Sequence, residues 1–303
     1  MLANKLKIGD TIGVIAPDKA LKNKDIKYLE NATKYFESLG LKVKYGKYLF
    51  SEDNYCAGTP KERAKDLNDM FSDKEIKAIF TVKGGDMVNG ILPYIDFENI
   101  KDNPKIFLGM SDITVLLCAI NKMTGLVTFH CQDYVWFGKD EVTDYDKNEI
   151  IEKLFNGNKK INPYGERKFY EFNKEEVKGK IYGTNVRCLL KLLGTPFIPD
   201  LEDAVLFLEG FHSNIIQWNA MLEQYNQMNA FNKAIVFGYI YQLQQIEENE
   251  KMIVDELRKI NSGVPVVKTN DFGHMHANSI IPIGAEVIIN ANNQSIVVSE
   301  YLK

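Results

Sequence analysis

A serine stands where an apolar strand pattern passes directly into a helical one, in the segment KIFLGMSDITVLLCAI at residues 105–120. Ser111 at such a junction could be an ordinary helix N-cap, since serine and aspartate are favoured there. It could also be a nucleophile held on a sharp turn at the carboxyl end of a strand. There the helix dipole and the amide of Asp112 would face a developing oxyanion. The segment lacks the second glycine of the G-x-S-x-G elbow, because Ile113 stands in its place, so both interpretations stay open.

Two adjacent glycines, Gly84 and Gly85, end another apolar strand pattern at residues 76–85. Their spacing fits neither the G-x-G-x-x-G dinucleotide fingerprint nor a phosphate-binding loop. Paired glycines after a strand let a ligand approach the backbone amides closely, although a tight turn would need them as well. If this strand and the one before Ser111 share a sheet, both glycines lie at the same edge as the hydroxyl. They would then supply a second amide donor beside it.

A nucleophilic serine needs a base, and the chain has 4 histidines. His130 ends an apolar strand pattern, which is typical of a buried and hydrogen-bonded ring, and His212 stands in a turn. His274 and His276 lie in NDFGHMHANSIIPIG, a loop between two strand patterns. No third ligand follows them at a suitable spacing, so no metal site is predicted. A histidine in such a loop suits a general base, because its pKa lies near working pH.

One carboxylate, Glu209, ends the strongly apolar strand pattern AVLFLEGF. An isolated buried carboxylate is costly, so it should be paired or hydrogen-bonded. An arginine or a backbone turn would serve as partner. A histidine ring N–H would serve too, and the carboxylate would then fix the tautomer and the orientation of the base. In that case the three groups follow the chain order Ser, Glu, His.

Strand and helix patterns alternate through the first half of the chain, which predicts an α/β fold with a parallel sheet. The helical pattern after residues 11–17 closes on Gly40, as a helix C-terminus would. From about residue 157 the chain becomes polar and irregular, and beyond it strand patterns predominate. The pair Asn292–Asn293 suits a hairpin turn, since asparagine tolerates a positive φ. The predicted organisation is a doubly wound first domain and a more β-rich second domain.

The composition is that of an ordinary globular protein, with 303 residues, 45% of them hydrophobic and 26% charged. A formal net charge of −4 argues against a nucleic-acid partner. No apolar run approaches the roughly 20 residues that span a bilayer, and the start MLANKLKIGD has no apolar signal-peptide core. The 4 cysteines show no C-x-x-C spacing, so neither zinc nor a disulfide framework is predicted. We expect a cytoplasmic protein with no membrane partner.

Five short motifs in order carry a resemblance to a known family: KGG, GMSDIT, LGTP, LFLE, and GH followed by IPIG. Together with GVIAP near residue 13, they make the chain resemble the LD-carboxypeptidases up to residue 284. This family of serine peptidases includes the microcin-immunity peptidases. The resemblance implies a Rossmann-like N-terminal domain, residues 1–165, that carries the nucleophile. It also implies a β-rich C-terminal domain, residues 166–303, that carries the Glu and His of a triad, and a homodimer.

Carried over motif by motif, the resemblance makes Ser111 the nucleophile and Glu209 and His274 its partners. His274 is preferred to His276 because it directly follows the glycine of the GH motif. The amides of Gly85 and Asp112 become the oxyanion donors, with Gly84 beside them. The implied activity releases the terminal D-alanine of murein tetrapeptide during peptidoglycan recycling, without a metal or organic cofactor.

The chain departs from the family pattern at Cys131–Gln132 and at Gly210–Phe211, and we expect these differences to touch the walls of the site more than the triad. Arg187 and Lys83 are candidates for holding the terminal carboxylate of a peptide. An alternative function is hydrolysis of aminoacyl-nucleotide conjugates, in which Trp136 would contact the base. A second alternative is a non-catalytic α/β module that binds a small molecule.

Overall fold

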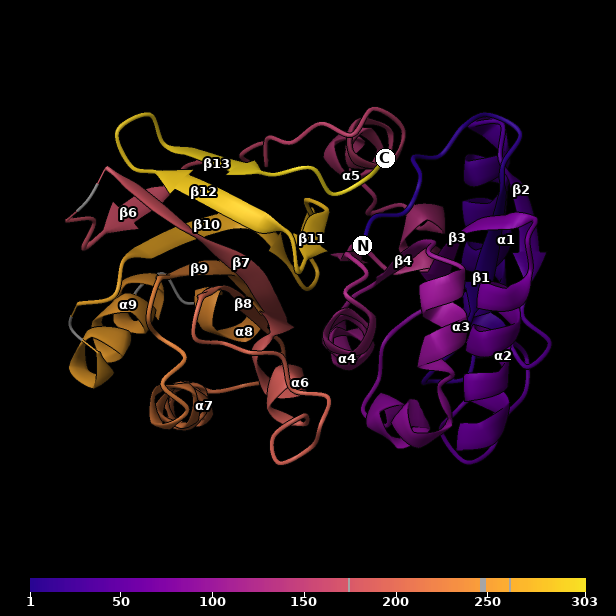
Figure 1. The fold of residues 1–303 in the computed structure, drawn as a ribbon, viewed down its shortest axis with the longest axis horizontal. Helices are drawn as coiled ribbons and strands as arrows, with labels where there is room; N and C mark the ends of the chain where they lie inside the picture. The colour runs from indigo at the N-terminus through magenta and orange to yellow at the C-terminus, as the bar shows by residue number, and fades with distance from the viewer. Residues whose placement is uncertain (174, 246–248, 262) are drawn as a thin grey trace.

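Two sheets form the frame of the molecule, which the computed structural model describes for residues 1–173, 175–245, 249–261 and 263–303. The first sheet has 6 strands in the order β11-β5-β4-β3-β1-β2, and the second has 7 in the order β13-β12-β7-β8-β9-β10-β6. Figure 1 shows the two sheets side by side with α4 between them. Helix α4 contacts both β7 and α6 of the second half, so the helix that follows Ser111 lies at the junction.

The first sheet confirms the predicted Rossmann-like architecture, since its first five strands along the chain pair in parallel. Its parallel strands are β1 (Thr11–Ile15), β2 (Lys42–Tyr45), β3 (Ile76–Thr81), β4 (Ile106–Gly109) and β5 (Thr128–His130). Its helices are α1 (Asn23–Ser38), α2 (Pro60–Ser72), α3 (Phe97–Asp102) and α4 (Thr114–Thr124), with short 3-10 helices η1 (Val88–Tyr94), η2 (Ser111–Ile113) and η3 (Tyr134–Gly138). Two further helical segments, α5 (Asp144–Glu149) and η4 (Ile150–Phe155), lead out of this half.

Helix α1 shows why the spacing of apolar residues in the sequence predicts a helix. Leu29, Ala32 and Phe36 recur at helical spacing and all are buried, so one stripe of α1 faces the core. The helix ends at Ser38, and Gly40 follows with φ of +80°. A left-handed residue just beyond a helix is most easily a glycine, because it has no Cβ. The predicted helix end at Gly40 is therefore confirmed.

The second half is also mixed rather than purely β. Its strands are β6 (Lys168–Tyr170), β7 (Glu176–Asn185), β8 (Ala204–Gly210), β9 (Ala234–Ile240), β10 (Val266–Gly273), β12 (Glu286–Asn290) and β13 (Ser295–Val298). Its helices are α6 (Val186–Leu190), α7 (Ile215–Gln227), α8 (Tyr241–Gln244) and α9 (Asn249–Ile260). Strands β7 to β10 pair in parallel, with antiparallel strands at both edges. The β12–β13 hairpin is present as predicted, but its positive φ falls on Gln294 and not on the asparagine pair.

Strand β11 (Ile281–Ile283) connects the two halves. It comes late in the chain but pairs antiparallel with β5 at the edge of the first sheet, where Ile281 lies opposite His130. The chain thus crosses the predicted boundary at residue 165, and the division into two domains there stays a prediction. The loop at 274–280 starts from β10 in one sheet and ends at β11 in the other. His274 therefore lies on a segment held at both ends.

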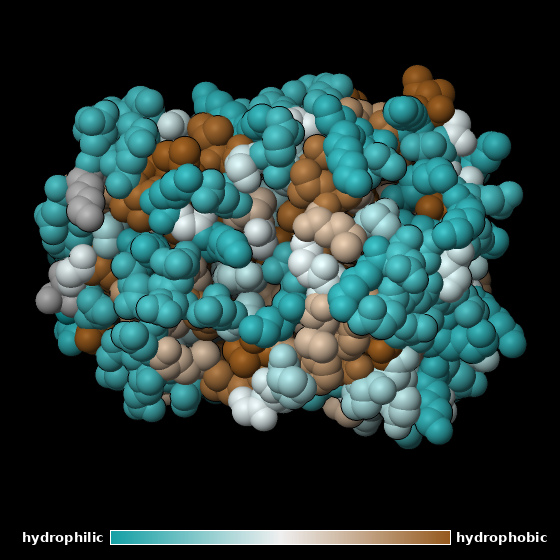
Figure 2. Space-filling view, viewed as in Figure 1, coloured by the Kyte–Doolittle hydropathy of each residue, from teal (hydrophilic) through white to brown (hydrophobic). Residues whose placement is uncertain are grey.

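Across the described residues, no helix combines the length and the apolar character needed to cross a bilayer. Figure 2 shows a face on which hydrophilic side chains predominate and hydrophobic ones form small separate areas.

Candidate active site

Ser111 lies directly after β4, in the turn η2 that leads into α4. Its φ is +59°, a left-handed conformation that a serine adopts only at a cost. An N-cap residue has extended backbone angles and a side chain bonded to helix amides. The Ser111 backbone is not extended, and its hydroxyl has no hydrogen-bond partner within the described residues. The geometry is that of a strained strand-to-helix elbow and not that of a cap.

Gly84 and Gly85 lie beside this elbow, as the strand order predicts. A Cβ added to Gly84 would stand 2.6 Å from the Ser111 Cβ and 3.1 Å from the Asp112 amide nitrogen. Only a glycine permits so close a contact. A Cβ on Gly85 would instead meet the Asp18 carboxyl at 2.5 Å. The structure thus brings Gly84 against the Ser111 turn, and Gly85, the next residue, against Asp18.

Glu209 and His274 form a buried pair at the ends of β8 and β10. The Glu209 side chain is fully buried, and the Nδ1–H of His274 donates to its Oε2 at 2.5 Å. Burial alone would raise the pKa of Glu209, but the neighbouring His274 outweighs it and lowers that pKa. Burial likewise opposes the imidazolium, yet Glu209 raises the pKa of His274 above 6.5. The bond leaves Nε2 of His274 as the nitrogen that can accept a proton.

Asn185 was not singled out by the sequence and completes this pair. Its Nδ2 donates to Oε1 of Glu209 at 2.9 Å, while its Oδ1 accepts from the Cys188 amide at 3.2 Å and caps α6. The Asn185 amide donates to Oγ1 of Thr114, the first residue of α4. Asn185 thus connects Glu209 to α4, the helix that follows Ser111. An asparagine between a strand and a helical pattern was the available signal.

The other histidines have structural partners. His130 is buried, accepts from Thr184 at Nδ1 (2.8 Å) and donates from Nε2 to Asn278 (3.1 Å). Burial lowers the pKa of His130 to about 4, so the ring is neutral. His276 stacks on Tyr239 with ring centroids 4.5 Å apart. The part of the chain that the structure describes contains no group of three His, Cys, Asp or Glu side chains that could hold a metal.

Comparison with known proteins shows to which family the chain belongs. Residues 12–131 match the model of the LD-carboxypeptidase N-terminal domain, and residues 178–289 match that of the C-terminal domain. The chain belongs to the LD-carboxypeptidase family. The probable murein peptide carboxypeptidase of Bacillus subtilis is 33% identical to it, over 97% of this chain and 92% of that protein. The microcin C7 self-immunity protein MccF of Escherichia coli is 28% identical, over 99% and 96%.

Solved structures agree with this assignment. An MccF-like protein from Bacillus anthracis superposes with a TM-score of 0.90 at 29% identity, covering 99% of both chains. The muramoyltetrapeptide carboxypeptidase of Oxalobacter formigenes superposes with a TM-score of 0.80 over 97% of this chain and 100% of that one. At 22% identity the second match speaks for the fold alone.

The departures from the LD-carboxypeptidase pattern lie closer to the triad than the sequence suggested. Phe211 stacks on the His274 imidazole with ring centroids 4.6 Å apart and an angle of 8°. Gln132 donates from Nε2 to the His276 carbonyl at 2.7 Å and so holds the loop that carries His274. We expected both departures to touch mainly the walls of the site. This is wrong for Phe211, because its ring covers one face of the His274 imidazole.

The two candidate cations of this LD-carboxypeptidase both have carboxylate partners. Lys83 pairs with Asp25 at 2.5 Å and its side chain is 20% exposed. Arg187 pairs with Asp86, which directly follows Gly85, at 2.8 Å and is 50% exposed. Arg187 also lies near enough to His274 to oppose its protonation. Arg187 is thus the more accessible cation beside the amide donors.

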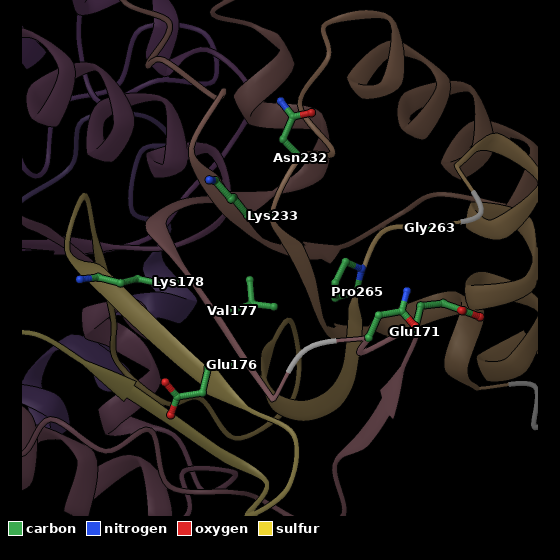
Figure 3. Close-up of a pocket in the computed structure, with 9 residues that line it drawn as sticks. Glu171, Glu176, Val177, Lys178, Asn232, Lys233, Gly263 and Pro265 are labelled. Atoms are coloured by element: carbon green, nitrogen blue, oxygen red, sulfur yellow. The ribbon is translucent and has the colours of Figure 1, made fainter.

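A pocket of 370 Å³ opens elsewhere, on the second half of the molecule (Figure 3). Its lining includes Glu171, Glu176, Lys178 and Lys233, and none of the site residues predicted from the sequence. It therefore adds nothing to the site around Ser111.

Gly84→Ala is expected to reduce kcat/KM at least about 100-fold, because the new methyl must displace the Ser111 side chain or the Asp112 amide. Gly90→Ala is the matched control, since a Cβ there meets nothing within 4 Å. It should stay within about twofold of the wild type. Steady-state kinetics and thermal melts of both variants test this. Equal activity of the two variants would contradict the close approach at Gly84.

Proposed function

We propose that the protein is a serine carboxypeptidase that hydrolyses the L,D-amide of murein tetrapeptide and releases its terminal D-alanine. The observation that carries the proposal is the buried 2.5 Å bond from His274 to Glu209, in a chain whose Ser111 is held at a positive φ. A carboxylate that fixes one ring nitrogen prepares the other for general base catalysis. The 33% identity to a probable murein peptide carboxypeptidase supports the substrate class.

In the proposed mechanism, Nε2 of His274 takes the proton of Ser111 as Oγ attacks the carbonyl carbon of the L-centre. The amides of Gly85 and Asp112 donate to the oxyanion, and Glu209 stabilises the imidazolium. His274 then protonates the leaving amine, D-alanine departs, and an ester joins Ser111 to the L-residue. Water, deprotonated by the same ring, hydrolyses that ester. No step uses a metal or an organic cofactor.

The terminal carboxylate of the substrate needs a cation, and we assign this role to Arg187. Its guanidinium is half exposed and lies next to the loop that carries the Gly85 amide, whereas Lys83 is more enclosed by its bond to Asp25. A planar guanidinium also suits bidentate recognition of a carboxylate. In this proposal the substrate competes with Asp86 for Arg187.

Hydrolysis of aminoacyl-nucleotide conjugates is the second candidate, because MccF is 28% identical over nearly the whole chain. Solved structures of MccF hold aspartyl sulfamoyl adenosine or adenosine monophosphate. Trp136 does not support this candidate here. Its ring is 8% exposed and its Nε1 lies 3.4 Å from Asp146 of α5, so it packs inside the domain.

The deciding experiment offers the purified protein three compounds: murein tetrapeptide, its diastereomer ending in L-alanine, and an aminoacyl-sulfamoyl adenosine. Products are measured by mass spectrometry. We expect release of D-alanine at least about 100-fold faster than release of L-alanine, since a site built for one configuration misplaces the other. Hydrolysis of the adenosine conjugate alone would select the second candidate. No hydrolysis of any compound by folded protein would contradict both.

The resemblance also supports a homodimer that acts in the cytoplasm during peptidoglycan recycling, and we include these points in the proposal. Light scattering behind a sizing column tests the first of them. A dimer has twice the 34.6 kDa mass of the chain, and elution at the single-chain mass at micromolar concentration would contradict it.

A further inference from the structure

Two carboxyl groups lie together under the loop that supplies the oxyanion donors. Asp18 follows β1 and is 1% exposed, and Asp112 follows Ser111 and is fully buried. The amides of the consecutive residues Met87 and Val88 donate to Asp18 and Asp112 respectively, and each of the two carboxyl groups shifts the pKa of the other. Two carboxylates in contact and away from water cannot both be ionised without a large penalty. A bond between them requires one proton, which the two groups share.

The hydrogen-bond donors around the two carboxyl groups favour ionisation of Asp112 over that of Asp18. Asp112 accepts from Nζ of Lys191 at 2.5 Å and from the Val88 amide at 3.0 Å, and both donors favour its ionised form. Asp18 accepts from the Met87 amide at 3.2 Å. Burial, with Asp112 beside it, raises the pKa of Asp18 to about 7. Burial opposes ionisation of Asp112 too, but Asp18 and Lys191 outweigh it and lower the pKa of Asp112.

Other ionisable groups face the pair from several elements. Arg63 of α2 donates to the carbonyls of Pro17, after β1, and Met87, in the Gly85 loop, at 2.7 and 3.4 Å, and so ties these two segments together. Its charge lowers the pKa of Asp18, but burial and Asp112 outweigh it. The thiols of Cys56 and Cys188 border the pair, and burial raises the pKa of each, so they stay neutral near pH 7. At the surface beside this loop, Asp86 pairs with both Lys19 and Arg187.

The pair connects the two segments that must meet in the oxyanion hole. On one side, Met87 donates to Asp18 and Val88 donates to Asp112, while Gly85 packs directly on the Asp18 carboxyl. On the other side, Asp112 is covalently next to Ser111 and provides the second amide. The same two side chains therefore hold the Gly85 loop and the nucleophile turn at a fixed separation.

We propose that Asp18 and Asp112 form a proton-sharing clamp that positions the oxyanion hole, with Asp18 as the partner that carries the proton. The proposal rests on the proposed hydrolysis and adds a positioning residue, Asp18, that touches no substrate. Loss of the shared proton places two negative charges in contact. The Gly85 loop then moves away from the Ser111 turn, and the oxyanion loses a donor.

The test compares pH profiles of kcat/KM for D-alanine release. Wild-type activity should fall above pH 7 and be roughly tenfold or more lower at pH 9, as Asp18 ionises. Asp18→Asn keeps a hydrogen-bond donor that cannot ionise. Its activity should therefore not decline between pH 7 and pH 9. Asp18→Ala removes the bond, and kcat should fall at every pH with a smaller change in KM.

Asp133→Asn is the matched control. Asp133 is a second buried carboxyl whose burial raises its pKa to about 7; it faces the Gly84 amide and His274, and neither Asp18 nor Asp112 is among the groups that shift its pKa. This variant should keep the wild-type decline above pH 7. If Asp133→Asn abolishes the decline and Asp18→Asn retains it, the clamp is refuted.

A readout without substrate separates this inference from the proposed function. In the folded protein Asp18 holds a proton that the unfolded chain releases above pH 4, so wild-type stability is lost as pH rises from about 4 to about 7. Asp18→Asn has no such loss. The difference in Tm, variant minus wild type, should therefore grow between pH 4 and pH 8. A constant difference would overturn the clamp, whether or not any murein peptide is hydrolysed.

Discussion

Ser111→Ala is expected to lower kcat for D-alanine release by about 10⁴-fold or more, because the acyl-enzyme can no longer form. Circular dichroism and Tm should stay close to those of the wild type, since the hydroxyl bonds to no other described residue. Trapping the ester on Ser111 by rapid quench and intact-mass measurement tests the same step directly. If Ser111→Ala keeps a tenth of the wild-type activity, the nucleophile lies elsewhere. If the wild type binds a ligand without hydrolysing it, and the variant binds that ligand equally well, the protein is a binding module.

Ser111→Gly separates catalysis from stability at the same position. Like alanine, glycine has no nucleophile, so the loss of activity should be equal. At a φ of +59°, however, glycine relieves strain that alanine retains. We expect Ser111→Gly to exceed Ser111→Ala by about 0.5–1 kcal/mol in free energy of unfolding, after the greater flexibility of the unfolded glycine chain is included. Urea titrations of the two variants measure the difference, and equal stabilities would contradict the strained elbow.

Glu209→Gln is expected to lower kcat by about 10³- to 10⁴-fold without loss of the fold. The reason lies in the hydrogen bonds around it. Asn185 presents its NH₂ group to residue 209, because its oxygen is already engaged by the Cys188 amide. A glutamine must therefore turn its oxygen toward Asn185 and its NH₂ toward Nδ1 of His274. The ring then carries its proton on Nε2 and cannot accept one from Ser111.

This explanation has its own test and control. In the double variant with Asn185→Asp, residue 185 accepts from the glutamine NH₂, so the glutamine oxygen can face His274 again. We expect kcat of the double variant to be about tenfold higher than kcat of Glu209→Gln alone. Asp66→Asn is the control, since Asp66 is a buried carboxylate in α2 that accepts from the Lys47 and Tyr48 amides far along the chain from the triad. It should lower Tm while kcat stays within about twofold.

The acid side of the activity profile follows from the same pair. Glu209 raises the pKa of His274, so the free base, and with it kcat/KM, should appear only as pH rises through a value above 6.5. Glu209→Gln removes the charge that raises this pKa, so the remaining activity should appear at lower pH. An unchanged acid limb would contradict the assignment of His274 as the base.

Much of the first half could be predicted because its signals are local and periodic. Buried strands alternate with amphipathic helices from β1 to β5, and that alternation implies a parallel sheet. The carboxyl ends of parallel strands meet at one edge, which is why the sequence alone predicts that Gly84 and Ser111 lie together. The positive φ of Ser111 could not be predicted, since serine is common at ordinary helix starts.

The remainder depends on contacts between distant parts of the chain. Strand β11 has only three residues, and its pairing with β5 is decided by the sheet edge it meets and not by its composition. Asp18 and Asp112 each resemble polar turn residues in the sequence. Only the fold shows that they are buried against each other. The stacking of Phe211 on His274 is equally invisible, because aromatic residues at strand ends usually serve packing alone.

The loop that carries His274 has a consequence for the order in which the enzyme becomes active. Its far end is fixed by β11, which pairs with a strand made some 150 residues earlier. Such distant pairings form late in folding, because the intervening chain must first be ordered. The serine elbow can therefore be complete in a nascent chain that still lacks a usable base. Under the proposed mechanism, hydrolysis therefore requires that β11 closes the first sheet, because a chain without this pairing holds Ser111 but no positioned base.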